Sequence, residues 1–236
     1  MENDLEKEPI NFEEFIKKIE NFELPTYKDL PEIPLYMEQV VGYINESLGA
    51  LSEAKDINIT PFMINNYVKA KIIDAPKEKK YNKTHLGYLI AISLLKIVVS
   101  MKNLALFIDI DRYDLLKVSQ NDVKTLYDTF KLMEEEALKN VIHKVKTRYD
   151  VLKKGNKKNK VENEIELENI NLAYIALKLY IEAEANKLIA DMIMERVSLD
   201  LLPKELKEKL DTSKYDRKKS VVEAKKLRDR QKGVKK

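Results

Sequence analysis

Two adjacent asparagines and a group of lysines are the side chains of this sequence whose types and spacing could do chemistry. Asn65 and Asn66 stand in one short segment, and five basic residues follow them. These basic residues are Lys69, Lys71, Lys77, Lys79 and Lys80. An asparagine amide can form two hydrogen bonds to adenine in the major groove of DNA, and lysines neutralise phosphates. The pattern therefore favours base recognition and backbone binding by separate residues of one unit.

The same side chains also fit an ordinary solvated surface, on which the asparagines are merely polar and the lysines only carry charge. The secondary structure expected around these residues helps to decide between DNA binding and a merely solvated surface. Thr60 is a good N-cap and a proline follows it, which predicts a short helix over residues 61–69. Residues 72–80 contain a proline and alternate aliphatic with basic residues, which suits a turn or a small wing.

Further helices are expected on both sides of this segment. Asn82 can cap a helix over residues 83–99, which is apolar around much of its circumference and should therefore lie at the centre of the core. An earlier helix is expected from Leu35 to a stop at Gly49, and a short one is expected from a cap at Ser100 to about residue 107. The order helix, helix, wing, helix is typical of a winged helix-turn-helix.

Residues 60–73, which read TPFMINNYVKAKII, are followed by KKY at 79–81 and by the apolar segment 86–99. This arrangement resembles the MerR-type winged helix-turn-helix over about residues 60–107. Residues 30–108 are similar to the YkrK-like bacterial family, a domain of unknown function whose members are presumed to be transcription regulators.

The resemblance implies a sequence-specific, DNA-binding transcription regulator whose partner is double-stranded DNA. The polar positions of its recognition helix fall on Asn65 and Asn66, where the MerR pattern has arginine and tyrosine, and Tyr81 anchors a wing that is shorter here. Together with the lysines, the candidate DNA-binding residues are Thr60, Asn65, Asn66, Lys69, Lys71, Lys77, Lys79, Lys80 and Tyr81.

Two long helices are predicted in the second half of the chain. The first runs from Ser119 to Gly155, the second spans residues 165–197, and we expect them to form an antiparallel pair. The second helix is apolar on nearly all sides, so it needs more than one neighbour. Its apolar residues include Leu179, Leu188 and Met192.

We expect a homodimer held by these helices, because one short recognition helix covers few base pairs and symmetric pairs are the usual solution. An N-terminal helix carrying Phe12, Phe15 and Ile19 could instead fold back over the same surface and complete a monomer. The functional alternative to DNA binding is a non-catalytic helical adaptor that binds another protein through residues 119–155 and 165–197.

The sequence thus predicts an all-α fold, a MerR-like winged helix-turn-helix followed by a long-helix antiparallel region for dimerisation or effector binding. Abundant Leu, Ile, Lys and Glu with scarce glycine favour helices throughout. The expected parts are an N-terminal helix and linker (1–31), the DNA-binding domain (32–110), the long-helix region (111–202) and a basic tail (203–236).

Composition argues against several classes of site. The chain has no cysteine and two widely separated histidines, so metal sites and cysteine nucleophiles are not expected. Asp109, Asp111 and Asp114 have the spacing of a magnesium-binding phosphoryl-transfer loop, which requires a parallel sheet. No strand signals surround them, so we expect them to end one helix and open the next. Neither enzyme activity nor a cofactor is therefore expected.

The composition of the N-terminal residues and the apolar pattern of the chain indicate where in the cell the protein is expected. The first twenty residues are acidic and lack the basic start and apolar run of a signal peptide. Lys96 interrupts the strongest apolar stretch, and the net charge is +3. We expect a cytoplasmic protein without membrane contact, whose small-molecule or protein effector the sequence does not identify.

Overall fold

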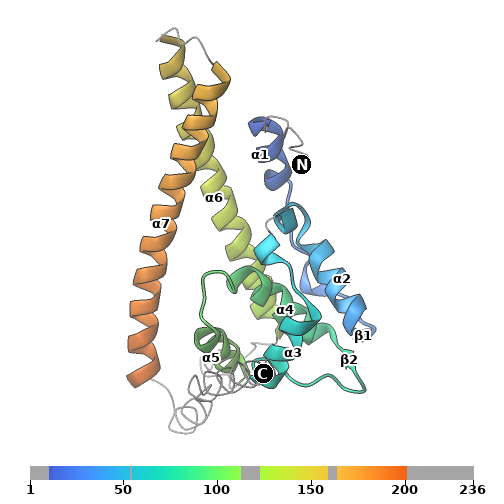
Figure 1. The fold of residues 1–236 in the computed structure, drawn as a ribbon. Coiled ribbons are helices and arrows are strands. Elements are labelled where there is room, and N and C mark those ends of the chain that lie inside the picture. Colours follow the sequence, from blue (N-terminus) through green and yellow to red (C-terminus); the bar gives the residue numbers. More distant parts are fainter. Residues whose placement is uncertain (1–10, 54, 113–122, 159–163, 201–236) are drawn as a thin grey trace, which may run out of the picture. The chain divides into compact units, whose positions relative to one another are not determined.

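The chain is mostly helical, as predicted (Figure 1). The computed structural model describes residues 11–53, 55–112, 123–158 and 164–200 of the 236-residue chain. The chain divides into two compact units, residues 1–185 and residues 186–236. The described part of the second unit, residues 186–200, is the end of the last helix.

Seven α-helices and two short strands lie within the described ranges. In chain order they are α1 (Phe12–Glu20), β1 (Leu35–Tyr36), α2 (Met37–Ser47), α3 (Pro61–Lys69), β2 (Lys80–Tyr81), α4 (Lys83–Leu95), α5 (Met101–Arg112), α6 (Val123–Lys158) and α7 (Glu164–Asp200). Short 3-10 helices occupy Tyr27–Asp29, Gly49–Glu53 and Lys55–Ile57.

The start of α3 follows from its cap and confirms the helix predicted over residues 61–69. The hydroxyl of Thr60 accepts a hydrogen bond from the Met63 amide, with 3.3 Å between oxygen and nitrogen. Pro61 occupies the first helical position, where its missing N–H leaves no hydrogen bond unmade.

The end of α3 is a Schellman motif, the two-bond arrangement that satisfies the last carbonyls of a helix. The Lys71 amide donates to the Val68 carbonyl at 3.0 Å, and the Ile72 amide donates to the Tyr67 carbonyl at 2.9 Å. Lys71 itself has a φ of 59°. A lysine thus occupies the left-handed position that glycine adopts at lower cost.

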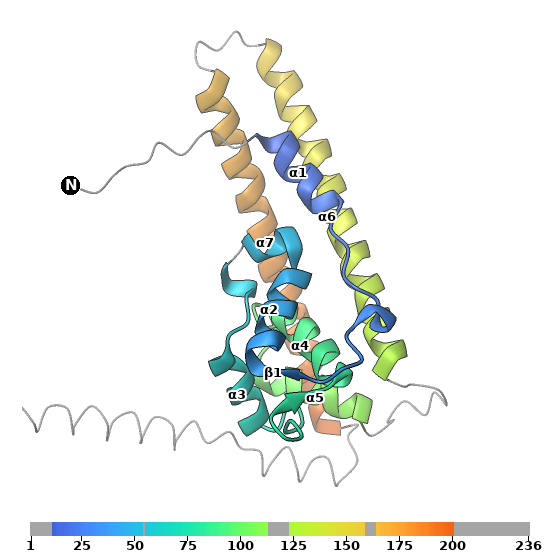
Figure 2. The ribbon, with the colours of Figure 1, turned by 90° about the vertical axis from the view of Figure 1, so that its right-hand side faces the viewer.

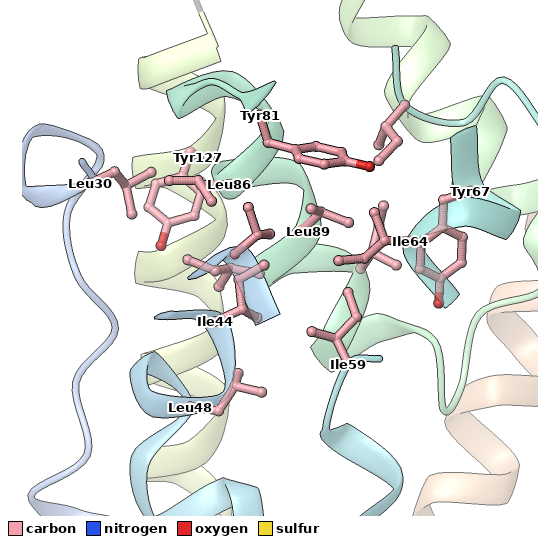
Figure 3. Packing of buried hydrophobic residues seen from close by; sticks show 14 of the residues in the cluster. Leu30, Ile44, Leu48, Ile59, Ile64, Tyr67, Tyr81, Leu86, Leu89 and Tyr127 are labelled. Atoms are coloured by element: carbon pink, nitrogen blue, oxygen red, sulfur yellow. The ribbon is translucent and has the colours of Figure 1, made fainter. Parts of the chain in front are cut away.

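The helix α4 lies at the centre of the first hydrophobic core, which confirms its predicted place (Figure 3). Leu86, Leu89 and Ile90 are fully buried, and they belong to one cluster with Ile44 of α2 and Ile64 of α3. Helices α2, α3 and α4 therefore share one core.

Two of the predicted helix ends before residue 112 were wrong. The helix α4 ends at Leu95 instead of residue 99, because the chain turns there and the Lys96 ammonium donates to the Asn58 carbonyl at 2.5 Å. The cap predicted at Ser100 is present, since its hydroxyl accepts from the Asn103 amide. The helix that it begins, α5, runs beyond the predicted end at 107, and its Ile108 is still buried.

The helix α6 also passes its predicted end, because it continues through Gly155 to Lys158. A side chain at Gly155 would meet nothing within 4 Å, so this glycine sits on an open surface. An exposed glycine inside a helix costs about 1 kcal/mol relative to alanine, which a helix of this length tolerates. The predicted start at Ser119 lies outside the described residues.

The strands β1 and β2 pair in an antiparallel ladder that the sequence analysis did not predict. Leu35 pairs with Tyr81, and Tyr36 pairs with Lys80. The ladder joins the entry of α2 to the segment just before α4, although these lie far apart in the sequence (Figure 1).

The N-terminal segment and α6 complete the first core. The hydroxyl of Tyr127 is 3.0 Å from the Pro25 carbonyl, to which it donates. The Tyr27 amide donates to the Asp128 carboxylate at 2.8 Å, and the Leu24 amide donates to the Glu135 carboxylate at 3.2 Å. Residues on both sides of the range 32–110 thus contribute to its core.

A second, smaller core joins α1, α6 and the first half of α7. Phe12 of α1 stacks on Tyr149 of α6, with 4.1 Å between the ring centroids, and Ile175 of α7 is buried in the same cluster. Arg148 and Glu182 form an ion pair of 2.5 Å between α6 and α7. Figure 2 shows α1 lying along α6. The N-terminal helix therefore does fold back onto the long helices.

None of the helices in the described ranges combines the length and the apolar character that crossing a membrane requires.

Candidate nucleic-acid interface

The helix α3 has one buried and one exposed face. Ile64 and Tyr67 point into the first core, and burial raises the pKa of the Tyr67 hydroxyl (Figure 3). Phe62, Asn65 and Lys69 are exposed on the other side. The spacing of these three, with half-buried Asn66 between them, is that of one helix face. α3 thus presents an aromatic ring, amides and a cation to solvent together.

The basic segment after α3 forms a tight hairpin turn, which is the element expected as a wing. The Lys80 amide donates to the Lys77 carbonyl at 2.9 Å, and these two residues form an antiparallel bridge. The central residues, Glu78 and Lys79, have φ angles of 52° and 64°. Two positive φ angles define a type I′ turn, which matches the twist of the strands on either side.

The segment around this turn is held to the core by aromatic contacts and hydrogen bonds. Tyr81 is buried and meets the edge of the His85 ring, with 5.4 Å between centroids, and burial raises the pKa of the Tyr81 hydroxyl. The other side of the His85 ring donates from Nε2 to the Asp74 carbonyl at 3.2 Å. Tyr81 thus joins the turn at residues 77–80 to the first core.

The candidate lysines differ in their surroundings. The side chains of Lys69, Lys77 and Lys79 are exposed, as is Lys71 at the end of α3. Lys80 is half-buried, and its ammonium lies 5.1 Å from the centroid of the Tyr36 ring. Lys80 therefore packs against β1, whereas the exposed lysines face solvent on α3 and the turn.

Thr60 differs from the other candidates because its hydroxyl already serves as the cap of α3. The same oxygen keeps its own O–H, which can still donate to an acceptor at the start of the helix. Thr60 is exposed, so its position fits a phosphate contact in addition to its structural role.

Two residues near this surface were missed in the sequence analysis. Phe62 is 74% exposed, although a large aromatic residue in a short helix is usually assigned to the core. Its spacing from Asn65 could have placed it on the exposed face. Lys96 lies on the opposite side of α3, where its ammonium contacts the Met63 sulfur at 3.6 Å and burial lowers its pKa. This lysine therefore packs against α3 on a side away from Phe62 and Asn65.

The acidic residues considered for phosphoryl transfer belong to the end of α5 and to the residues that follow it. Asp109 and Asp111 lie in the last turn of α5, as expected, and Asp114 lies outside the described residues. No group of three or more metal-ligating side chains is found within the described ranges.

Comparison with known proteins identifies the region that holds this surface. No curated protein and no solved structure matches the chain. The model of one family, described as a domain of unknown function (DUF1836), matches residues 25–130. This range begins and ends near the contact between Pro25 and Tyr127, and it contains most of the first core, to which Phe22 and Leu24 also belong. Residues 25–130 are therefore similar to this family, and the rest of the chain lies outside the match.

Proposed function

We propose that residues 25–130 form a MerR-like winged helix-turn-helix, related to the YkrK-like family, and that the protein is a sequence-specific DNA-binding transcription regulator. The observation that carries the proposal is the exposed face of α3, which presents Phe62, Asn65 and Lys69 and is followed in the chain by a basic turn. In this arrangement α3 enters the major groove, and the turn at residues 77–80 lies along the phosphates.

The backbone of two lysines supports the proposal. Lys71 and Lys79 have φ angles of 59° and 64°, a conformation that costs a side-chain-bearing residue about 1 kcal/mol or more. Glycine would relieve this strain, and yet both positions carry cations, one at the end of α3 and one in the turn at residues 77–80. Strain of this kind is typical of positions whose side chain has a function.

The roles within the interface follow from geometry. Asn65 is exposed in the middle of α3 and can pair with adenine through its amide, whereas the lysines can hold phosphates. Asn65→Ala should cost about 1–3 kcal/mol at one base position and relax the preference there. Lys79→Ala should weaken binding to all sequences about equally.

The test is selection of bound sequences from a random duplex pool by the full-length protein, followed by titrations at several salt concentrations. The triple change Lys69→Gln, Lys77→Gln and Lys79→Gln should remove most binding and lower the salt slope by about three, one for each phosphate contact. Lys80 is left unchanged because it packs against Tyr36.

A matched control removes three exposed lysines that lie outside α3, the turn and the two long helices: Lys17, Lys28 and Lys102. Both triple variants lose the same charge, so a general charge effect would weaken them equally. No enriched sequence motif, or equal losses in the two variants, would contradict the proposal.

We also propose that the protein acts as a homodimer through its long helices. Although α1 packs onto α6 and α7, many large apolar side chains of α7 stay exposed. These are Ile170, Tyr174, Leu177, Tyr180, Ile181, Leu188, Ile189, Met192 and Ile193. Monomers rarely expose apolar patches of this extent, and a two-fold dimer would let two copies of α3 read two half-sites.

The same exposed residues give specific support to the alternative, a helical adaptor that binds another protein. Salt dependence distinguishes the two functions. Binding through phosphate contacts weakens steeply as salt rises, whereas an apolar protein interface changes little.

A further inference from the structure

A cavity of about 460 Å³ lies between α4, α5 and α6, apart from the surface proposed for DNA. Its volume falls in the range of ordinary small-molecule pockets, about 300–1,000 Å³. Four aromatic rings contribute to its wall, and the rest of the lining is almost entirely aliphatic. The rings belong to Tyr88, Phe107, Tyr127 and Phe130.

Glu134 is the one charged residue among the described residues that line this cavity. It stands one turn after Phe130 on α6, and its carboxylate has no hydrogen bond or ion pair with the described residues. The next residue behaves differently, because Glu135 pairs with Lys131 at 2.6 Å and accepts from the Leu24 amide. Burial in this apolar setting raises the pKa of Glu134.

Because the Glu134 carboxylate has no partner in an otherwise apolar wall, it determines which charge a molecule bound in the cavity should carry. Removing a charge from water is costly unless an opposite charge compensates it. Aromatic faces add to this preference, because their negative π surface attracts cations. An anion would be repelled by Glu134, and a neutral apolar molecule would bury the carboxylate without compensation.

We propose that this cavity binds a lipophilic organic cation whose charge pairs with the Glu134 carboxylate and whose apolar body lies among the aromatic rings. The proposal does not depend on DNA binding, because every residue that it uses faces the cavity and none belongs to the exposed face of α3. α4 and α6 both line the site and both contribute to the first core.

The experiment is calorimetric titration of the full-length protein with two probes, tetraphenylphosphonium and tetraphenylborate. These ions are similar in size and shape and opposite in charge, so they separate charge recognition from simple apolar binding. The phosphonium should bind at least tenfold more tightly than the borate. Equal affinities, or tighter binding of the borate, would overturn the proposal.

Variants locate the site. Glu134→Gln should weaken phosphonium binding at least tenfold and strengthen borate binding, because the variant no longer repels an anion. Glu136→Gln, which changes an exposed residue of the same helix, should alter neither. Unchanged phosphonium affinity in Glu134→Gln would refute the assignment. Circular dichroism and melting curves establish that each variant is folded.

A third variant tests whether the probes occupy the cavity or the exposed side of α7. Ala91 lines the cavity on α4, and Ala91→Phe should fill part of it and reduce phosphonium binding. Phosphonium binding that survives Ala91→Phe at full strength would place the cation elsewhere and overturn the proposal. None of these measurements uses DNA, so failure here is distinguishable from failure of the DNA-binding proposal.

Discussion

At the scale of single residues, Phe62 gives the exposed face of α3 a property that asparagines and lysines lack. Its ring is 74% exposed at the second position of the helix, on the same face as Asn65. Apolar side chains in the major groove recognise the methyl group of thymine. We therefore expect Phe62 to select thymine at one position of the bound sequence.

Phe62→Ala should lower affinity by about 1 kcal/mol, the free energy of burying roughly one methyl group. Replacing that thymine with deoxyuridine should cost the wild-type protein a similar amount, because it removes the same methyl group, and should cost the variant nothing. Fluorescence titration of the four combinations measures this coupling. Additive losses would show that the ring and the methyl do not touch.

A second residue-scale prediction concerns Glu134 and stability. Burial raises the pKa of this carboxyl in the folded protein above its ordinary value of 4.5. The neutral form therefore favours folding, and the stability that it contributes is present at low pH and is lost as pH rises through the raised pKa. Glu134→Gln should consequently raise the melting temperature at pH 7.

The advantage of Glu134→Gln should disappear below pH 4.5, where the carboxyl is protonated in both the folded and unfolded states. Thermal melts of wild type and variant between pH 3.5 and pH 7.5 test this, in the absence of any ligand. Glu136→Gln serves as the control, because its exposed carboxylate should show no such trend. A constant difference at every pH would argue against burial as the cause.

At the scale of elements, the end of α3 allows stability and DNA binding to be separated. Lys71→Gly should stabilise the protein by up to about 1 kcal/mol, because glycine adopts the φ of 59° without strain. The same change removes a cation beside α3 and should weaken DNA binding. Denaturant unfolding and DNA titration of one protein sample measure both effects.

Lys69→Gly is the matched control, since it also replaces a lysine with glycine on the same helix. It lies in the last turn of α3, where glycine should destabilise by about 1 kcal/mol. The two variants should thus shift stability in opposite directions while both weaken DNA binding. A loss of stability in Lys71→Gly would mean that contacts of the lysine outweigh its backbone strain.

The elements that the sequence predicted well are those with strong local signals. α3 has a capping threonine and a proline at its first position, and the helix predicted over about residues 61–69 was confirmed. The weaker predictions relied on single residues. Gly155 was taken as a helix end, but an exposed glycine costs too little to stop a helix that is supported by its neighbours.

Long-range features of the candidate site were not accessible from local patterns. The β1–β2 ladder has two residues in each strand, too few to give an alternating pattern, and it forms because the core brings its strands together. The cavity beside Glu134 likewise depends on how three helices pack. The exposed positions of Asn65 and Lys69 could be predicted, because polar residues in a short apolar helix mark the face that points to solvent.

At the scale of the whole molecule, the exposed apolar residues of α7 predict association. Sedimentation of the full-length protein at micromolar concentration should give a species of twice the chain mass of 27.6 kDa. Leu188→Glu should convert it to monomer, because a charge in an apolar interface lacks compensation. Asn186→Glu, which adds the same charge at an exposed position two residues before Leu188, should leave the dimer intact.

A monomer in the wild-type protein at this concentration would refute the dimer and leave the apolar side of α7 for a different protein partner. Dissociation by both variants would instead indicate that added negative charge, rather than the loss of Leu188, separates the subunits. A dimer that survives Leu188→Glu would place the interface on another surface.

The hydrogen bonds from Leu24 and Tyr27 to α6 have a consequence for the order in which this protein folds. They join residues more than a hundred positions apart, and Tyr127 fills the core between them. Contacts of such separation form late, because a long loop must close first. On the ribosome, α2, α3 and α4 are therefore synthesised well before their core can be completed. Nascent chains that stop short of residue 135 should remain protease-sensitive, and protection should begin only once α6 has emerged.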